Sequence, residues 1–128
     1  MVARRGSSRV GAFVGLALAL LAFAPLARAH AILVASKPAA NAELVGADVE
    51  VDVSLEFNSR IDATRSSLQL AKDGGALQPV ALGETDKPNF LVGKPAKLAP
   101  GAYRLRWQVL SVDGHVSRGD VNFKVRAP

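Results

Sequence analysis

Two histidines, His30 and His115, are the only imidazole side chains in the 128-residue chain, and its candidate chemistry centres on them. The chain has no cysteine, so thiolate nucleophiles, thiolate metal sites and redox pairs are excluded. It also has no glycine-rich phosphate loop, no Gly-x-Ser-x-Gly elbow and no His-Glu-x-x-His motif, so we do not expect an enzyme. Metal binding through nitrogen and oxygen donors is the chemistry that these residues leave open.

The first 29 residues have the pattern of a secretory signal peptide. Their apolar stretch is shorter than the roughly 20 residues that a membrane-spanning helix needs, although an uncleaved membrane anchor remains the alternative. We expect cleavage after Ala29, which leaves residues 30–128 as the mature chain. The pattern consists of the basic residues Arg4, Arg5 and Arg9, the apolar run from Val10 to Ala24, and the sequence Ala27-Arg28-Ala29.

Removal of this segment changes the electrostatic character of the protein. The full chain has a formal charge of +5, but the mature 99 residues hold 12 basic and 11 acidic side chains, which gives +1. A nearly neutral domain lacks the basic footprint of a nucleic-acid-binding protein, so we exclude that class. The only methionine, Met1, is also removed, so the mature protein has no sulfur ligand of any kind.

Cleavage would make His30 the first residue of the mature protein. An N-terminal histidine offers a free α-amine and the imidazole Nδ1, which together close a chelate ring around one metal ion. The pKa of an α-amine is about 7.7–8.0, so a metal can displace its proton under mild conditions. An internal histidine cannot chelate in this way, because its backbone nitrogen is an amide. The alternative is that a histidine follows the cleavage site by chance.

The sequence Asp113-Gly114-His115 places a carboxylate and an imidazole two residues apart. Side chains at positions i and i+2 of an extended chain project in the same direction, and Gly114 allows the backbone to bend. The alternative is that Asp-Gly simply forms a preferred hairpin turn with an exposed histidine beside it. Taken together, His30, Asp113 and His115 would supply three nitrogens and one oxygen to one metal ion.

This donor set favours Cu(II), with one ion per chain. Cu(I) prefers thiolate and thioether ligands, which the mature chain lacks, whereas tetragonal nitrogen and oxygen sites suit Cu(II). The Irving–Williams order also places Cu(II) above Zn(II) and Ni(II) for such donors. A structural zinc site would more often be closed by four side-chain ligands that include cysteine.

The elements that position these residues are predicted to be β-strands. Apolar and polar residues alternate over 49–57, 103–109 and 121–125, and no segment of the mature chain has a helical period. Trp107 falls on the apolar side of its strand, which indicates a core position. About seven short strands, separated by turn sequences, predict one all-β domain over 30–128, an immunoglobulin-like antiparallel Greek-key β-sandwich. Weaker strands are expected at 32–35, 67–70, 77–82 and 90–92, the last as a short edge strand within a loop over 82–98.

The mature chain resembles the bacterial CopC copper-resistance proteins from His30 to about Val125. The resemblance is carried by the opening His30-Ala-Ile-Leu-Val-Ala-Ser-Lys-Pro-Ala39 and by the stretch from Trp107 to Phe123, which contains Asp113-Gly-His115. It implies a monomeric periplasmic sandwich that holds Cu(II) at one end through His30 and His115. Asp113 would be an oxygen ligand or a close outer partner of the copper. A membrane copper-uptake protein of the CopD kind is the implied partner.

Two features of the sequence depart from the family pattern. Some members have a methionine-rich Cu(I) site, which the mature chain cannot form. Others carry an acid two residues after the strand phenylalanine, where Ser59 follows Phe57 here, so no ligand is expected there. Glu56 lies on the opposite face of the strand and is expected to be a solvated charge. The other functions considered are a copper-dependent oxidative enzyme with a histidine-brace site and a metal-free interaction sandwich.

Overall fold

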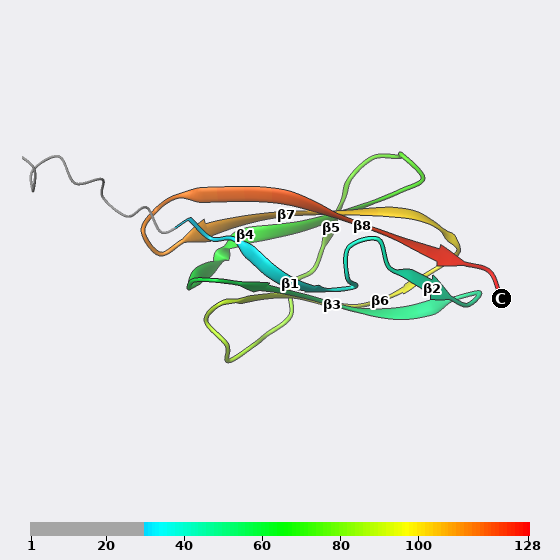
Figure 1. Ribbon diagram of the computed structural model, residues 1–128, viewed down its shortest axis with the longest axis horizontal. Coiled ribbons are helices and arrows are strands. Elements are labelled where there is room, and N and C mark those ends of the chain that lie inside the picture. The colour runs from blue at the N-terminus through cyan, green and yellow to red at the C-terminus, as the bar shows by residue number, and fades with distance from the viewer. Residues whose placement is uncertain (1–29) are drawn as a thin grey trace, which may run out of the picture.

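The computed structural model describes residues 30–128, which form two β-sheets packed face to face (Figure 1). The predicted signal peptide, residues 1–29, lies outside the described residues. No helix in the described part of the chain is long and apolar enough to cross a membrane. The strands are β1 (Leu33–Lys37), β2 (Glu43–Val45), β3 (Val49–Phe57), β4 (Ile61–Lys72), β5 (Gln78–Val80), β6 (Phe90–Leu98), β7 (Gly101–Ser111) and β8 (Val116–Arg126).

The two sheets confirm the predicted β-sandwich, with eight strands instead of about seven. One sheet has the order β1-β3-β6 and the other the order β2-β8-β7-β4-β5. All neighbouring strands are antiparallel except β2 and β8, which pair in parallel. The additional strand, β2, contains only three residues and was not predicted.

The alternating residues of β3, β7 and β8 form the core between the sheets. Phe57 of β3 packs edge-on against Trp107 of β7, with ring centroids 5.1 Å apart, which confirms the core position of Trp107. Tyr103 and Phe123 stack at 5.3 Å further along the same sheet. Burial of this apolar surface is the main force that holds the two sheets together. The core also contains Val51, Val53, Leu55, Leu68, Leu91, Leu105, Val109, Val121 and Val125.

The expectation of a loop over 82–98 with a strand only at 90–92 is wrong in its second half. Strand β6 continues to Leu98 and pairs with β3 along most of its length. Pro95 is tolerated there because β6 is an edge strand and because the pairing shifts register opposite Val51 to Val53. Lys94 and Lys97 are exposed on this strand.

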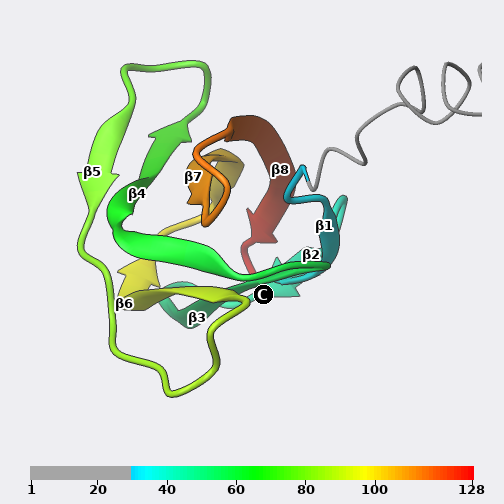
Figure 2. The same cartoon turned by 90° about the vertical axis from the view of Figure 1, so that its left-hand side faces the viewer.

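One end of the sandwich gathers the candidate site residues. The described chain begins beside the turn between β7 and β8 at the left-hand end of Figure 1, and the C-terminus lies at the opposite end. Figure 2 looks onto the site end, with the β7–β8 turn facing the viewer and β1 beside it. Long antiparallel pairing of β7 with β8, from Gly101 opposite Val125 to Leu110 opposite Val116, fixes the position of this turn.

Candidate metal centre

The structure brings the two histidines of the chain together. Their imidazole rings meet edge to face, with centroids 5.2 Å apart and an angle of 69° between the ring planes. Both residues are exposed, so an ion from solution can reach the space between them. His30 lies just ahead of β1 in one sheet, and His115 just ahead of β8 in the other. The site therefore bridges the two sheets at one end of the sandwich.

The position of His30 is fixed by the two residues that follow it. The side chain of Ala31 is only 3% exposed and belongs to the core. The backbone N–H of Ile32 donates to Asn58 Oδ1 at 2.8 Å, and the Asn58 N–H donates to the Ile32 carbonyl at 2.9 Å. These two hydrogen bonds attach the segment at Ile32 to Asn58, directly after β3, much as hydrogen bonds join neighbouring β-strands. Sequence analysis did not identify this residue, because no local pattern links it to Ile32.

The β7–β8 turn holds His115 through backbone geometry. The Gly114 N–H donates to the Ser111 carbonyl at 2.9 Å, and the Ser111 N–H donates to the His115 carbonyl at 2.8 Å. Gly114 has a φ of 90°, a conformation that side chains with a Cβ rarely adopt. The glycine between Asp113 and His115 is thus required by the turn that presents both side chains.

Both carboxylate oxygens of Asp113 contact neighbouring residues. Oδ1 accepts hydrogen bonds from the Ser111 hydroxyl and from the His115 N–H, the latter at 3.2 Å, while Oδ2 lies 3.1 Å from His115 Nδ1. The Ser111 hydroxyl above all, followed by the other donors, lowers the pKa of Asp113 to about 2. An ionised carboxylate beside Nδ1 favours the proton on that nitrogen and leaves Nε2 of His115 with its lone pair for a metal.

Ser111 is the second residue that sequence analysis missed. Its side chain is 3% exposed and lies at the end of β7, where it joins Asp113 to the turn. The Ser-x-Asp spacing was a usable signal, because a serine two residues before an aspartate can bond to it locally.

Two buried side-chain polar atoms have no hydrogen-bond partner in the described part of the chain, Ser59 Oγ and Trp107 Nε1. Trp107 lies against Gly119 of β8, where an added Cβ would come within 2.5 Å of the indole ring.

Glu56, which was expected to be a solvated charge, is half-buried and forms no ion pair within residues 30–128.

The side chains alone do not complete a metal site. Within residues 30–128, no group of three or more histidine, aspartate or glutamate side chains is arranged to hold a metal ion. The structure supplies two facing imidazoles, with Asp113 turned onto one of them. In the full chain the backbone nitrogen of His30 is a peptide amide, and cleavage after Ala29 would convert it into an amine. The third nitrogen donor expected from the sequence would therefore require processing of the chain.

A comparison with protein families decides the relationship of this sandwich to known proteins. The CopC domain model matches residues 33–126, which includes Asp113 and His115. The chain belongs to the CopC family. It is 31% identical to copper resistance protein C of Pseudomonas syringae pv. tomato, a match that covers 89% of this chain and 94% of that protein.

Two solved structures have the same fold as this CopC-family chain. CopC from Methylosinus trichosporium OB3b is 32% identical, with a TM-score of 0.68 over 77% of this chain and 95% of that one. PcoC from Escherichia coli, described as a methionine-rich copper resistance protein, is 27% identical, with a TM-score of 0.63 over 77% of this chain and 100% of that one. The present chain differs from PcoC in having no methionine in residues 30–128.

Proposed function

We propose that the mature protein is a periplasmic carrier that binds one Cu(II) ion at the end of the sandwich where His30 meets His115. The ligands would be the α-amine and Nδ1 of His30 and Nε2 of His115, with Asp113 as the fourth contributor. The observation that carries this proposal is the apposition of the two imidazoles, 5.2 Å between centroids, at the point where the mature chain would begin.

Copper is favoured over other metals by the chemistry of the donors and by the relatives. Three nitrogens and a carboxylate form a tetragonal set that suits Cu(II), and no sulfur is present to favour Cu(I). Membership of the CopC family and the names of its copper-resistance relatives point to the same metal.

Asp113 is proposed to act at close range, as an oxygen ligand or through His115. Its bonds to Ser111 and to His115 Nδ1 support the second role, because a carboxylate on the distal nitrogen orients a metal-binding imidazole. Asp113→Asn separates the two roles. A direct ligand would change the Cu(II) EPR parameters, whereas an orienting carboxylate would leave them nearly unchanged and weaken binding by about 10- to 100-fold.

The biological task would be to sequester Cu(II) or to deliver it to a partner in the membrane. We propose that the protein acts as a monomer and that a CopD-like copper transporter is a suitable acceptor. Two sheets joined by a well-packed core give a rigid support for a site that must bind and release the same ion without chemical change.

The test begins with mass analysis of the exported protein, which should start at His30. One equivalent of Cu(II) should then raise the melting temperature, because a ligand that binds only the folded state stabilises it. EPR should show an axial Cu(II) signal with nitrogen couplings. His115→Asn should lose most of the stabilisation, whereas Ser67→Asn, an exposed change on β4, should retain it. A melting temperature unaffected by copper would favour a metal-free interaction sandwich, and oxidised sugars formed from polysaccharide with ascorbate and oxygen would favour an enzyme.

A further inference from the structure

The outer face of the five-stranded sheet carries an excess of cations. The inward residues of β7 and β8 are buried, so the alternate residues of these strands point away from the core. Five of them are cationic. Arg126, the last residue of β8, is paired with Glu43 of β2, and we call the surface formed by the other four the arginine face. It consists of Arg104 and Arg106 on β7 and of Arg118 and Lys124 on β8.

Only one of these four cations is neutralised within residues 30–128. Arg106 forms a two-pronged bond with Asp120, with its Nε 3.0 Å from Oδ1. Arg104, Arg118 and Lys124 form no ion pair there. The mature protein has a net charge of only +1, so this concentration of positive charge on one face is a local feature and not a consequence of overall composition.

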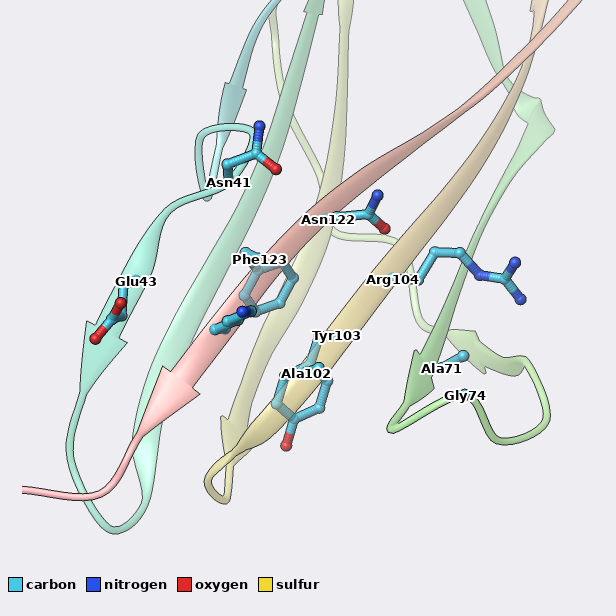
Figure 3. Close-up of a pocket in the computed structure, with 10 residues that line it drawn as sticks. Asn41, Glu43, Ala71, Gly74, Ala102, Tyr103, Arg104, Asn122 and Phe123 are labelled. Atoms are coloured by element: carbon cyan, nitrogen blue, oxygen red, sulfur yellow. The ribbon is translucent and has the colours of Figure 1, made fainter.

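The pairing of β7 with β8 places the planar side-chain amides of Asn122 and Gln108 beside the cations. Arg104 of β7 lies opposite Asn122 of β8, and Arg118 of β8 lies opposite Gln108 of β7. Two shallow, open hollows lie on this surface, one of about 550 Å³ around Arg106 and Arg118 and another of about 520 Å³ around Arg104 and Lys124, which Glu43 also lines. Figure 3 shows the second hollow, where Arg104 and Asn122 project from neighbouring strands.

From this arrangement we infer that the arginine face docks an acidic protein surface, one rich in aspartate and glutamate side chains. The planar guanidinium group binds a carboxylate through two parallel hydrogen bonds, and neighbouring amides add further donors. Side chains held on paired strands favour such directional recognition over the diffuse attraction of a lipid surface. Beside Arg104, the buried Ala71 and the small Ala102 offer no large apolar side chain for insertion into a membrane, and the large apolar side chain exposed on these strands, Val116, lies at the start of β8.

The arginine face adjoins the candidate metal centre. Arg118 of β8 lies three positions after His115, which immediately precedes that strand, so a partner that engages Arg118 would lie close to the imidazole pair. We therefore place the docking partner where it would exchange copper with this site. This link to copper rests on the proposed function, whereas the docking surface itself does not.

The experiment uses the mature protein, residues 30–128, and poly-L-glutamate as the acidic probe. Backbone NMR spectra should show chemical-shift changes concentrated on β7 and β8, at and around Arg104 and Arg118. The triple variant Arg104→Gln/Arg118→Gln/Lys124→Gln should weaken binding by about tenfold. The matched control is Lys37→Gln/Lys94→Gln/Lys97→Gln, which removes the same charge from the other sheet and should change binding far less.

Three outcomes would overturn the inference. Equal losses in the two triple variants would show that net charge alone governs the interaction. Binding to phosphatidylglycerol vesicles without binding to poly-L-glutamate would assign the face to a membrane. Concentration-dependent self-association that the arginine-face variant abolishes would assign it to the acidic β3 surface of a second copy, which carries Glu50, Asp52 and Glu56. Cu(II) titration of the same variants should be unchanged, so that loss of docking and failure of the copper site are measured separately.

Discussion

The imidazole of His30 stands edge-on to that of His115, with 5.2 Å between the ring centroids. The two residues belong to segments that flank strands of different sheets, so their proximity is a product of the tertiary fold. Each is held by a separate device: Asn58 fixes the backbone beside His30, and the turn from Ser111 to His115 fixes the other ring.

Extension of the mature chain by a single alanine ahead of His30 should weaken Cu(II) binding by roughly 100-fold or more. The extension converts the amine into an amide, and the chelate effect of a second nitrogen at high effective concentration is lost. A competition titration against a chelator of known affinity measures the change. A single alanine added after Pro128 is the control and should have no effect. Equal affinities for the two extended proteins would remove the amine from the ligand set.

Replacement of Asn58 by alanine should lower the free energy of unfolding by about 1 kcal/mol, because the Ile32 N–H loses its side-chain acceptor. Cu(II) affinity should also fall, since His30 lies two residues before Ile32 and loses part of its anchoring. Chemical denaturation and copper titration measure the two effects. The matched control is Asn122→Ala on β8, whose side chain is exposed and forms no hydrogen bond within residues 30–128. Unchanged copper affinity in Asn58→Ala would show that the ring pair forms without this clamp.

Removal of the Ser111 hydroxyl should raise the pKa of Asp113 from about 2 towards its ordinary value of 3.8, because this hydroxyl is the largest cause of the shift. A folded-state pKa below the unfolded one means that ionised Asp113 stabilises the fold above about pH 4 and that this contribution is lost as the pH falls towards 2. The stability advantage of the wild type over Ser111→Ala should therefore shrink over that interval.

Carboxyl NMR titration of Asp113 and denaturation at several pH values measure these effects. Ser67→Ala, at an exposed serine of β4, should leave the Asp113 titration unchanged. Ser111→Thr, which keeps a hydroxyl, should retain most of the pKa shift. If the threonine variant titrates like the alanine variant, the hydroxyl is not the cause.

A methyl group at position 119 should destabilise the sandwich by about 1–3 kcal/mol, the usual cost of overpacking. In Gly119→Ala the new Cβ would lie 2.5 Å from Cζ2 and 2.7 Å from Cε2 of Trp107, so the indole must move. Trp107 is the only tryptophan, and its fluorescence therefore reports this movement directly. In the Trp107→Phe background the smaller ring should tolerate the methyl group better. Additive costs of the two substitutions would show that the indole is not the obstacle.

The long strands of the fold were predictable because their signal is local. Alternation over 49–57 and over 103–109 matches β3 and the central part of β7. By contrast, β2 has three residues and is stabilised by parallel pairing with β8, a partner far along the chain. The second half of β6 was obscured by Gly93 and Pro95, which are tolerated there because the strand lies at a sheet edge and contains an irregular pairing.

The residues of the candidate site also fall into those that a local sequence pattern reveals and those that it does not. His30, Asp113 and His115 could be selected from residue type and spacing alone, and the structure places the two rings together. The contact between Asn58 and Ile32 has no sequence signature, because Asn58 bonds only to the backbone N–H and carbonyl of Ile32, groups that almost any residue at that position would supply. Ser111 was accessible to sequence reasoning through its spacing from Asp113, but its burial was not.

The two ends of residues 30–128 lie at opposite ends of the long axis (Figure 1), with His30 against His115 of the β7–β8 turn and Pro128 beyond the end of β8. A linker attached at Pro128 would tether the protein to an electrode or a bead with its imidazole pair directed outward into the sample. Affinity tags and fluorescent fusions belong at that pole as well, because any peptide joined ahead of His30 would occupy the nitrogen on which the proposed capture of the ion depends.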